Sequence, residues 1–146
     1  MYKLNQLKKI IVDVNLKLVT KSDFLFLFKL LKERDPSENI SHKKMPTYKE
    51  HVKFISSKPY KKWYIIKCQN KKVGSTYLTG RNEIGIFIKK EFQVNNIGTK
   101  AIKSLMKKDS RIRYLANINP KNTKSIKFFK KNGFKLIQYT YELEIN

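Results

Sequence analysis

Apolar and polar residues follow two periods along this chain, and the changes between the two periods outline its secondary structure. Alternation at every second position predicts strands over residues 14–19, 63–69, 73–78, 83–88, 112–118 and 134–145. Apolar residues at helical spacing predict four helices, beginning near residues 22, 47, 97 and 123. The expected order of elements is therefore β-α-α-β-β-β-α-β-α-β.

Start and stop signals define the first two helices. The first should end near Arg34, because Pro36 keeps the residue before it out of helical geometry. The second opens on a capping box formed by Thr47 and Glu50. In that second helix the residues expected to face inward are Tyr48, Val52 and Ile55, whereas His51 is expected to be partly exposed.

The run over residues 119–134 carries the clearest signals. Asn122 or Thr123 can cap a helix by accepting hydrogen bonds from its first free N–H groups. Asn132 and Gly133 then stop the helix, since both tolerate the left-handed conformation common at helix ends. Taken alone, this run indicates only an amphipathic helix packed on a sheet.

A second segment adds a functional meaning. Residues 83–101 predict a strand, a tight loop and a helix, and residues 93–98 are similar to the pyrophosphate loop Gln/Arg-x-x-Gly-x-Gly/Ala of the GNAT superfamily of acyl-CoA-dependent N-acetyltransferases. Residues 122–134 resemble that family's Asn-x-x-(Ala/Ser)-x-x-(Phe/Leu)-(Tyr/Phe)-x-x-x-Gly-Phe helix. The resemblance covers most of the chain from about residue 16. It implies an α/β (α+β) fold of GNAT type, with a mixed, mostly antiparallel sheet flanked by four helices.

Length and composition predict one domain. The 146 residues suffice for a single core and are too few for two, so we expect one domain over 1–146, with 1–12 as an N-terminal extension of unknown role. No apolar run approaches a membrane span, and the N-terminus lacks the apolar stretch of a secretory signal. The single cysteine, Cys68, is expected to be a buried strand residue. We therefore expect a cytoplasmic protein with no membrane partner.

The formal net charge of +22 invites a nucleic-acid interpretation, because Lys and Arg neutralise phosphates. Only four of the 33 basic residues are arginines, however, and specific base and phosphate recognition relies on Arg. Solvated lysine faces are the favoured interpretation, and no specific nucleic acid is expected as a partner. A non-catalytic, basic nucleic-acid-binding protein remains an alternative.

The resemblance implies acetyl-CoA as co-substrate, used in direct transfer within a ternary complex, and no metal site is expected. The loop would wrap the pyrophosphate at the N-terminus of the following helix. Asn96 replaces the family's first glycine there, and Asn enters positive-φ conformations more readily than other non-glycine residues. The residues implied for acetyl-CoA are Phe87, Ile88 and Lys89 by their backbone, then Gln93, Val94, Asn95, Asn96, Ile97, Gly98, Thr99, Asn122, Ser125 and Phe129.

Candidate catalytic residues follow from the need to deprotonate an amine. Glu83 begins the strand where related acetyltransferases carry a working carboxylate, although it also fits an exposed glutamate at a hairpin end. The family often supplies a Tyr as the acid for the leaving thiolate, but Phe129 holds that position here. Tyr139 and Tyr141 are possible replacements, or else packing residues of the last strand.

The acceptor is the least determined part. Arg34, Asp35 and His42 lie at or in the stretch where this fold binds its acceptor. A small-molecule amine such as an amino sugar is the first hypothesis, and a protein or peptide amine the second. A catalytically weak relative that only binds acyl-CoA is a third. The protein is expected to be a monomer or a homodimer.

Overall fold

The computed structural model describes residues 13–34 and 44–146. The expected N-terminal extension 1–12, together with Asp35 and His42, lies outside the described residues. The strands are β1 (Val14–Leu18), β2 (Lys62–Cys68), β3 (Lys71–Leu78) and β4 (Ile84–Ile88), and the helices are α1 (Phe24–Glu33), α2 (Tyr48–Ser56), α3 (Ile97–Lys108) and α4 (Thr123–Lys131). Single 3-10 turns precede α1 (η1, Lys21–Asp23) and follow β4 (η3, Lys90–Phe92).

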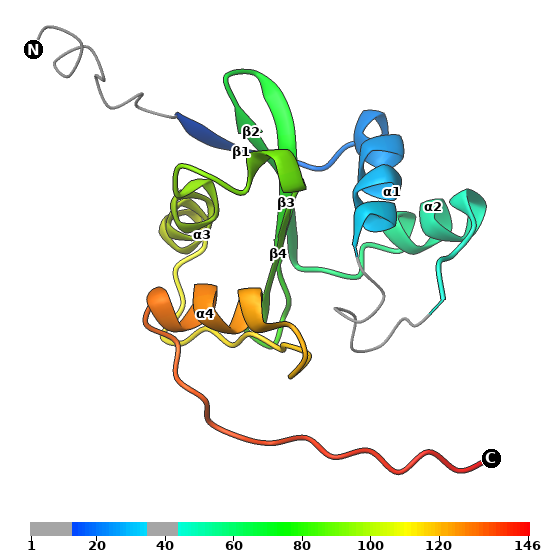
Figure 1. Ribbon diagram of the computed structural model, residues 1–146. Helices are drawn as coiled ribbons and strands as arrows, with labels where there is room; N and C mark the ends of the chain where they lie inside the picture. Colours follow the sequence, from blue (N-terminus) through cyan, green and yellow to red (C-terminus); the bar gives the residue numbers. More distant parts are fainter. Residues whose placement is uncertain (1–12, 35–43) are drawn as a thin grey trace, which may run out of the picture.

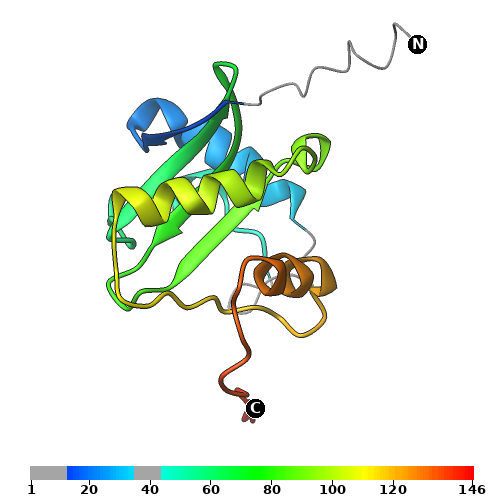
Figure 2. The ribbon, with the colours of Figure 1, turned by 90° about the vertical axis from the view of Figure 1, so that its left-hand side faces the viewer.

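The four strands form one antiparallel sheet in the order β1-β2-β3-β4, with helices on both faces. Helices α1 and α2 cover one face, where Leu27, Ile55 and Ile65 form a buried cluster. Helix α3 lies across the opposite face (Figures 1 and 2). There Ala101 and Ile102 are fully buried against the sheet. The expected three-layer α/β architecture is confirmed, and Cys68 is buried in β2 as predicted.

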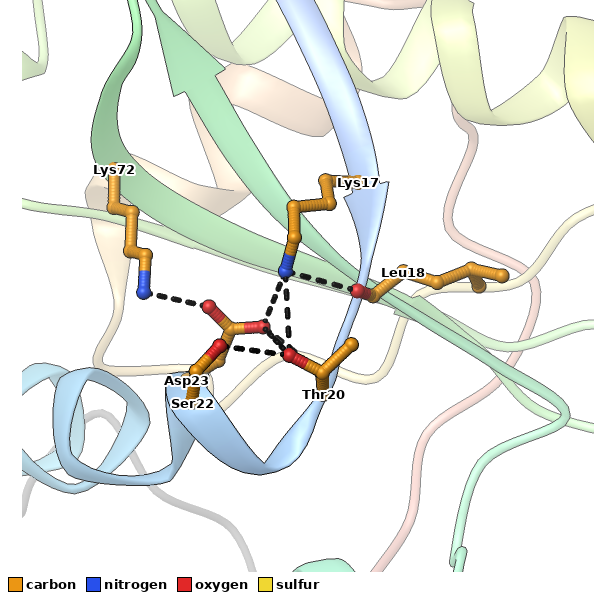
Figure 3. A network of polar contacts seen from close by, with 6 residues as sticks. All are labelled: Lys17, Leu18, Thr20, Ser22, Asp23 and Lys72. Atoms are coloured by element: carbon orange, nitrogen blue, oxygen red, sulfur yellow. Dashed lines mark hydrogen bonds and ion pairs between the residues drawn. The ribbon is translucent and has the colours of Figure 1, made fainter.

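A buried carboxylate ties α1 to the sheet (Figure 3). Asp23 is fully buried, and its oxygens meet Lys17 of β1 at 2.8 Å and Lys72 of β3 at 2.6 Å. The backbone N–H of Thr20 donates to the same carboxylate at 2.8 Å. Burial alone would raise the pKa of Asp23, but the two ammonium groups and this N–H outweigh it and lower the pKa to about 2. The carboxylate therefore stays charged and joins two strands to the start of the helix.

Two of the expected strands do not form. In residues 112–118 only Leu115 pairs, through a parallel bridge to Glu83, because this segment diverges from β4 beyond Ile84. The named strands all pair antiparallel, and this isolated bridge is the one parallel contact among the described residues. The strand expected over residues 134–145 is absent: Phe134 N–H donates to Phe129 C=O, and residues 135–145 extend away from the sheet with no backbone hydrogen bond to the described residues. Alternation predicts only that a segment is suited to a strand; pairing requires a neighbour.

The inward face of α2 is also shifted from the prediction. His51 is buried, with its ring 5.8 Å from that of Phe28 and 6.3 Å from that of Phe54. Tyr48, expected inside, is 43% exposed, whereas Ile55 is buried as predicted. Phe28 of α1 and Phe54 of α2 pack against the flat imidazole, which takes the place of an apolar side chain. Burial lowers the pKa of His51, so the ring is neutral in the folded protein near neutral pH.

The Asp23 network should make stability depend on acid. Because the folded-state pKa of about 2 lies below the ordinary 3.8, the contribution is complete above pH 3.8 and is lost as the pH falls through 2. We expect the unfolding free energy of the wild type to fall over this window by about 2 kcal/mol more than that of Asp23→Asn. Denaturant titrations at a series of pH values measure this difference in unfolding free energy. Asp13→Asn, a change at an exposed carboxylate, is the control. Parallel curves for wild type and Asp23→Asn would contradict the assignment.

Candidate functional site

A cavity of about 360 Å³ opens between β4, the loop that leads into α3, and the first turns of α4. Its size is typical of small-molecule sites. It brings together nearly all the residues that the sequence implies for acetyl-CoA. The predicted residues that line it are Phe87, Ile88, Gln93, Val94, Asn95, Asn96, Ile97, Gly98, Thr99, Asn122 and Ser125. Lys89 and Phe129 do not line it.

Strand β4 contributes an open backbone edge to the cavity. On its inner side Lys89 N–H donates to Val73 C=O at 2.8 Å, so the peptide groups of odd-numbered residues face β3. Those of Ile84, Ile86 and Ile88 face the other way. Ile84 N–H is used by Leu115 C=O, but the outward N–H groups of Ile86 and Ile88 have no partner among the described residues. Two unpaired donors therefore point toward the cavity.

This parity corrects the backbone assignment made from the sequence. Phe87 and Lys89 were expected to offer their peptide groups to pantetheine, yet both are paired toward β3. The available N–H groups belong to Ile86 and Ile88, and Ile86 was not among the residues expected from the sequence. Alternation in the sequence shows which side chains share a face. It cannot show which backbone groups face the neighbouring strand, because that depends on the register of pairing.

The loop after β4 turns sharply with the help of two asparagines. Asn95 and Asn96 both have φ of 57°, the left-handed region that Asn tolerates better than other non-glycine residues. Asn96 thus holds the conformation expected of the glycine it replaces. Its side-chain oxygen accepts a hydrogen bond from Lys131 Nζ at 2.9 Å, which links the loop to α4. Gln93 Nε2 closes the other end of the loop on Ile88 C=O at 2.8 Å.

The N-terminus of α3 is suited to an anion. Gly98 and Thr99 lie in its first turn, line the cavity, and have backbone N–H groups with no partner among the described residues. The helix dipole adds partial positive charge at that end. Lys90, Lys124 and Lys131 also line the cavity. The set of unpaired N–H groups and ammonium groups fits a phosphate ester.

Gly98 is required by packing as well. A Cβ on this residue would lie 2.9 Å from the ring of Phe128 on α4, closer than real Cβ contacts. The absent side chain lets the two helices meet at the cavity wall. Phe128 was not among the residues that the sequence implied for this site. Its neighbour Phe129, predicted to line the channel, is buried and packs its ring against Phe128 and Phe134 at 5.1 and 5.0 Å. Phe129 is therefore a core residue.

Asn122 caps α4 as expected. Its side-chain oxygen accepts the backbone N–H of Ser125 at 3.1 Å. This bond fixes the first turn of the helix at the rim of the cavity, opposite the N-terminus of α3. The amide nitrogen of the same side chain is left for a ligand, since the capping bond uses only the oxygen.

Glu83 lies outside the cavity lining, at the start of β4. Its carboxylate accepts hydrogen bonds from Thr79 Oγ1 at 3.0 Å and from Asn117 Nδ2. Residues two or four apart along a strand share a face, so Glu83 lies on the same face of the sheet as Phe87. The cross-strand neighbours Ser75 and Ile65 identify this face as the one covered by α1 and α2. Arg34 reaches that side of the cavity, with its guanidinium 5.3 Å from the Phe87 ring. The structure thus places Glu83 and Arg34 on one face, at opposite ends of β4.

An aromatic cluster covers the same face beside Glu83. Tyr60 stacks on Tyr77 of β3, with ring centroids 3.7 Å apart, and Trp63 donates from Nε1 to Ser75 Oγ at 2.7 Å. Gly85 makes room for it, since a Cβ there would lie 2.1 Å from the Tyr77 ring. Burial raises the pKa of Tyr77 and of Tyr60, so both hydroxyls stay protonated. Sequence periodicity does not reveal this cluster, because Tyr60 lies between α2 and β2, outside both elements.

Tyr139 and Tyr141 are not brought to the cavity. They are 75% and 90% exposed on the segment that follows α4. Among the described residues, none of those that line the cavity is a tyrosine. The same part of the chain holds no group of three His, Cys, Asp or Glu side chains arranged for a metal ion. Within residues 13–34 and 44–146, every helix falls short of the length and hydropathy that a bilayer crossing requires.

Residues 25–134 match the model of the acetyltransferase (GNAT) family. No curated protein matches the sequence. Solved structures share the fold. A domain from Methanocaldococcus jannaschii DSM 2661 is 25% identical, with a TM-score of 0.76 over 90% of this chain and 94% of that one.

Two further structures contain coenzyme A. RimL, described as a ribosomal L7/L12 alpha-N-protein acetyltransferase, is 19% identical, with a TM-score of 0.69 over 86% of this chain and 81% of its own. An aminoglycoside N-acetyltransferase in complex with CoA is 14% identical, with a TM-score of 0.69 over 92% of this chain and 95% of its own. At these identities the likeness concerns the fold.

The left-handed loop gives a testable prediction at Asn96. Asn96→Gly and Asn96→Val both remove the hydrogen bond from Lys131, but only valine is strained at φ 57°. We expect Asn96→Val to unfold with a free energy about 1–2 kcal/mol lower than Asn96→Gly, measured by urea denaturation. Equal stability of the two variants would show that the backbone conformation at this position costs nothing.

Proposed function

The chain belongs to the acetyltransferase (GNAT) family, and from this premise we propose that it transfers an acetyl group from acetyl-CoA to a primary amine within one ternary complex. The open edge of β4 carries the proposal. Unpaired N–H groups of Ile86 and Ile88 face a cavity that ends at the N-terminus of α3. An acyl-CoA has amide groups that can pair with the backbone of β4 and phosphates that can bind at the N-terminus of α3.

In this proposal, pantetheine lies along β4 as an added strand, bonded to Ile86 and Ile88. The N–H groups of Gly98 and Thr99 bind the pyrophosphate, and Lys90 and Lys124 neutralise its charge. Backbone donors fixed in a strand need no rearrangement on binding, which favours affinity. Neither Asn96 nor Phe129 weakens this binding, since the first has the required conformation and the second packs in the core.

The transfer step needs a neutral amine and a polarised thioester. We propose that Glu83 takes a proton from the acceptor ammonium, directly or through a water, and that a β4 N–H donates to the thioester oxygen. The amine nitrogen then forms a bond to the carbonyl carbon as the carbon–sulfur bond breaks, and the sulfur leaves with the electron pair. The acylated nitrogen releases its remaining extra proton to the departing thiolate or to water, which yields the neutral amide. A thiol pKa near 8.5 makes the thiolate a fair leaving group without a tyrosine acid.

We propose a small molecule such as an amino sugar as the acceptor. The face that holds Glu83 and Arg34 also carries the aromatic cluster of Tyr60, Tyr77 and Trp63, and flat aromatic surfaces with fixed hydroxyls suit ring-shaped, hydroxylated ligands. An aminoglycoside acetyltransferase shares the fold, which supports this choice. RimL, a protein acetyltransferase, shares it equally, so a protein or peptide amine is the alternative.

The role of Glu83 predicts a separation of catalysis from binding. Glu83→Gln should lower kcat about 100-fold or more, because the amide cannot accept the proton. Its affinity for acetyl-CoA should be unchanged, since Glu83 lies outside the cavity lining. Steady-state kinetics at a series of pH values measure kcat, and calorimetric titration measures the affinity for acetyl-CoA. Glu91→Gln, a change at an exposed carboxylate near the same strand, is the control and should keep wild-type kcat. An unchanged kcat across pH in Glu83→Gln would overturn the assignment.

The acceptor class can be tested by thiol release from acetyl-CoA. We expect turnover with amino sugars and none above background with peptides that offer a free N-terminus. The reverse result would select the protein acceptor. Tight CoA binding with no turnover on any amine would indicate the weakly catalytic relative, and would leave the binding part of the proposal standing.

A further inference from the structure

Arg34 is the only arginine among the described residues that line the cavity. Its backbone forms the end of α1, and its guanidinium lies 5.3 Å from the Phe87 ring. Phe87 belongs to the face of the sheet that α1 and α2 cover, whereas Ile97, at the start of α3, packs on the opposite face with Ile88. Arg34 therefore lies on the face that holds Glu83, away from the helix N-terminus suited to phosphate.

The guanidinium of Arg34 keeps unused hydrogen-bond donors. Its Nε is buried and has no hydrogen-bond partner within the described part of the chain. The ion pairs formed by these residues use the carboxylates of Asp23 and Glu91, so none of them neutralises Arg34. Glu33 precedes it in the sequence but lines a separate, smaller cavity. A buried donor without a partner is costly, and a ligand that accepts a hydrogen bond from it removes this cost.

The ring of Phe87 holds this guanidinium without using its donors. A guanidinium is attracted to the face of an aromatic ring, and the contact consumes no N–H group. The planar group can therefore offer parallel N–H donors to one ligand, the geometry that matches a carboxylate or a phosphate. A lysine would supply the charge but not the paired donors. Arg34 thus suits an anionic group better than a neutral hydroxyl.

The face between Glu83 and Arg34 carries opposite charges at its two ends. The Tyr77 hydroxyl lies over Gly85, midway between Glu83 and Phe87 along the backbone. Burial raises the pKa of Tyr77, the positive charge of Arg34 lowers it, and the negative charge of Glu83 raises it, so both charges act on this hydroxyl. At about 3.3 Å per residue, roughly 13 Å of backbone separate Glu83 from Phe87. One small ligand can therefore meet both charges.

We propose that the acceptor is an amine that also carries an anionic group, with its amine at Glu83 and its phosphate or carboxylate at Arg34. The inference rests on the proposed transfer to an amine at Glu83. An amino sugar phosphate has this composition. A ligand with an amine at one end and an anion at the other matches the charges of the face, whereas a polycationic amine brings a like charge to Arg34. The net charge of +22 further attracts an anionic acceptor.

Calorimetric titration of the full chain, saturated with CoA, tests the inference without requiring turnover. Bound CoA fills the phosphate site at α3, so a second anion reports on the acceptor side of the cavity. Glucosamine, glucosamine 6-phosphate and glucosaminuronic acid share one ring and are compared in about 0.15 M salt, which screens general attraction to a basic surface. We expect an anionic amine to bind roughly tenfold or more tightly than glucosamine. The tighter of the two anionic amines identifies phosphate or carboxylate as the preferred group.

Variants at Arg34 assign the effect to its side chain. Arg34→Met removes the charge and the donors, and should raise the dissociation constant of the tighter anionic amine by roughly tenfold or more. Arg34→Lys keeps the charge without the planar donors, and should lie between Arg34→Met and the wild type. The matched control is Lys32→Met, which removes an exposed cation that contacts the Phe28 ring from the same helix, at 5.0 Å. It should keep the wild-type affinity for the anionic amine.

Kinetics with acetyl-CoA separate this inference from the proposed function. Arg34→Met should raise KM for the anionic amine by a larger factor than it lowers kcat. Equal wild-type affinity for glucosamine and the anionic amines would overturn the inference, even if all three are acetylated. Tighter binding of the polycationic kanamycin, or an Arg34→Met variant that loses affinity for CoA and not for the anionic amine, would also overturn it. Binding of the anionic amine that depends on Arg34, with no acetylation of any amine, would support the inference and contradict the proposed function.

Discussion

The separation of β4 from the segment that follows α3 is the constraint on which the rest of the site depends. The two backbones are bonded only around Leu115, where Ile84 and Asn82 supply the partners. Beyond that point β4 is paired on one side alone. An unpaired strand edge inside a domain is costly unless something satisfies its peptide groups. In this molecule the open edge faces a cavity, so the unsatisfied groups become a binding surface.

The surrounding elements keep the edge of β4 open and place the N-terminus of α3 at the same cavity. Gly98 lets α3 approach Phe128 of α4, and the Asn96–Lys131 hydrogen bond joins the loop to the same helix. The cavity is therefore held between two helices that are coupled to each other, and α3 also packs directly on Ile84 and Ile88 of β4. On the far side of the sheet, the buried Asp23 carboxylate fixes α1 to β1 and β3. Elements packed on both faces of the sheet thus position a cavity that is bounded on one side by the backbone of β4.

The sequence predicted the parts of this arrangement that are local. Helix caps, the left-handed Asn96 and the position of Gly98 depend on a few neighbouring residues, and the structure confirms their conformations. Features set by register or by distant packing were missed. The peptide groups that face the cavity belong to Ile86 and Ile88 because of how β4 pairs with β3, which no periodicity reveals. His51 is buried because α1 supplies aromatic neighbours. Residues 134–145 have the pattern of a strand, yet pattern cannot supply a partner.

Amide hydrogen exchange at β4, followed by NMR with and without acetyl-CoA, tests the central claim most directly. If the open edge binds pantetheine, the amides of Ile86 and Ile88 should exchange more slowly once acetyl-CoA is bound. Those of Gly85 and Phe87, already paired toward β3, should change little. Saturable binding of acetyl-CoA that leaves the Ile86 and Ile88 amides unprotected would contradict the account.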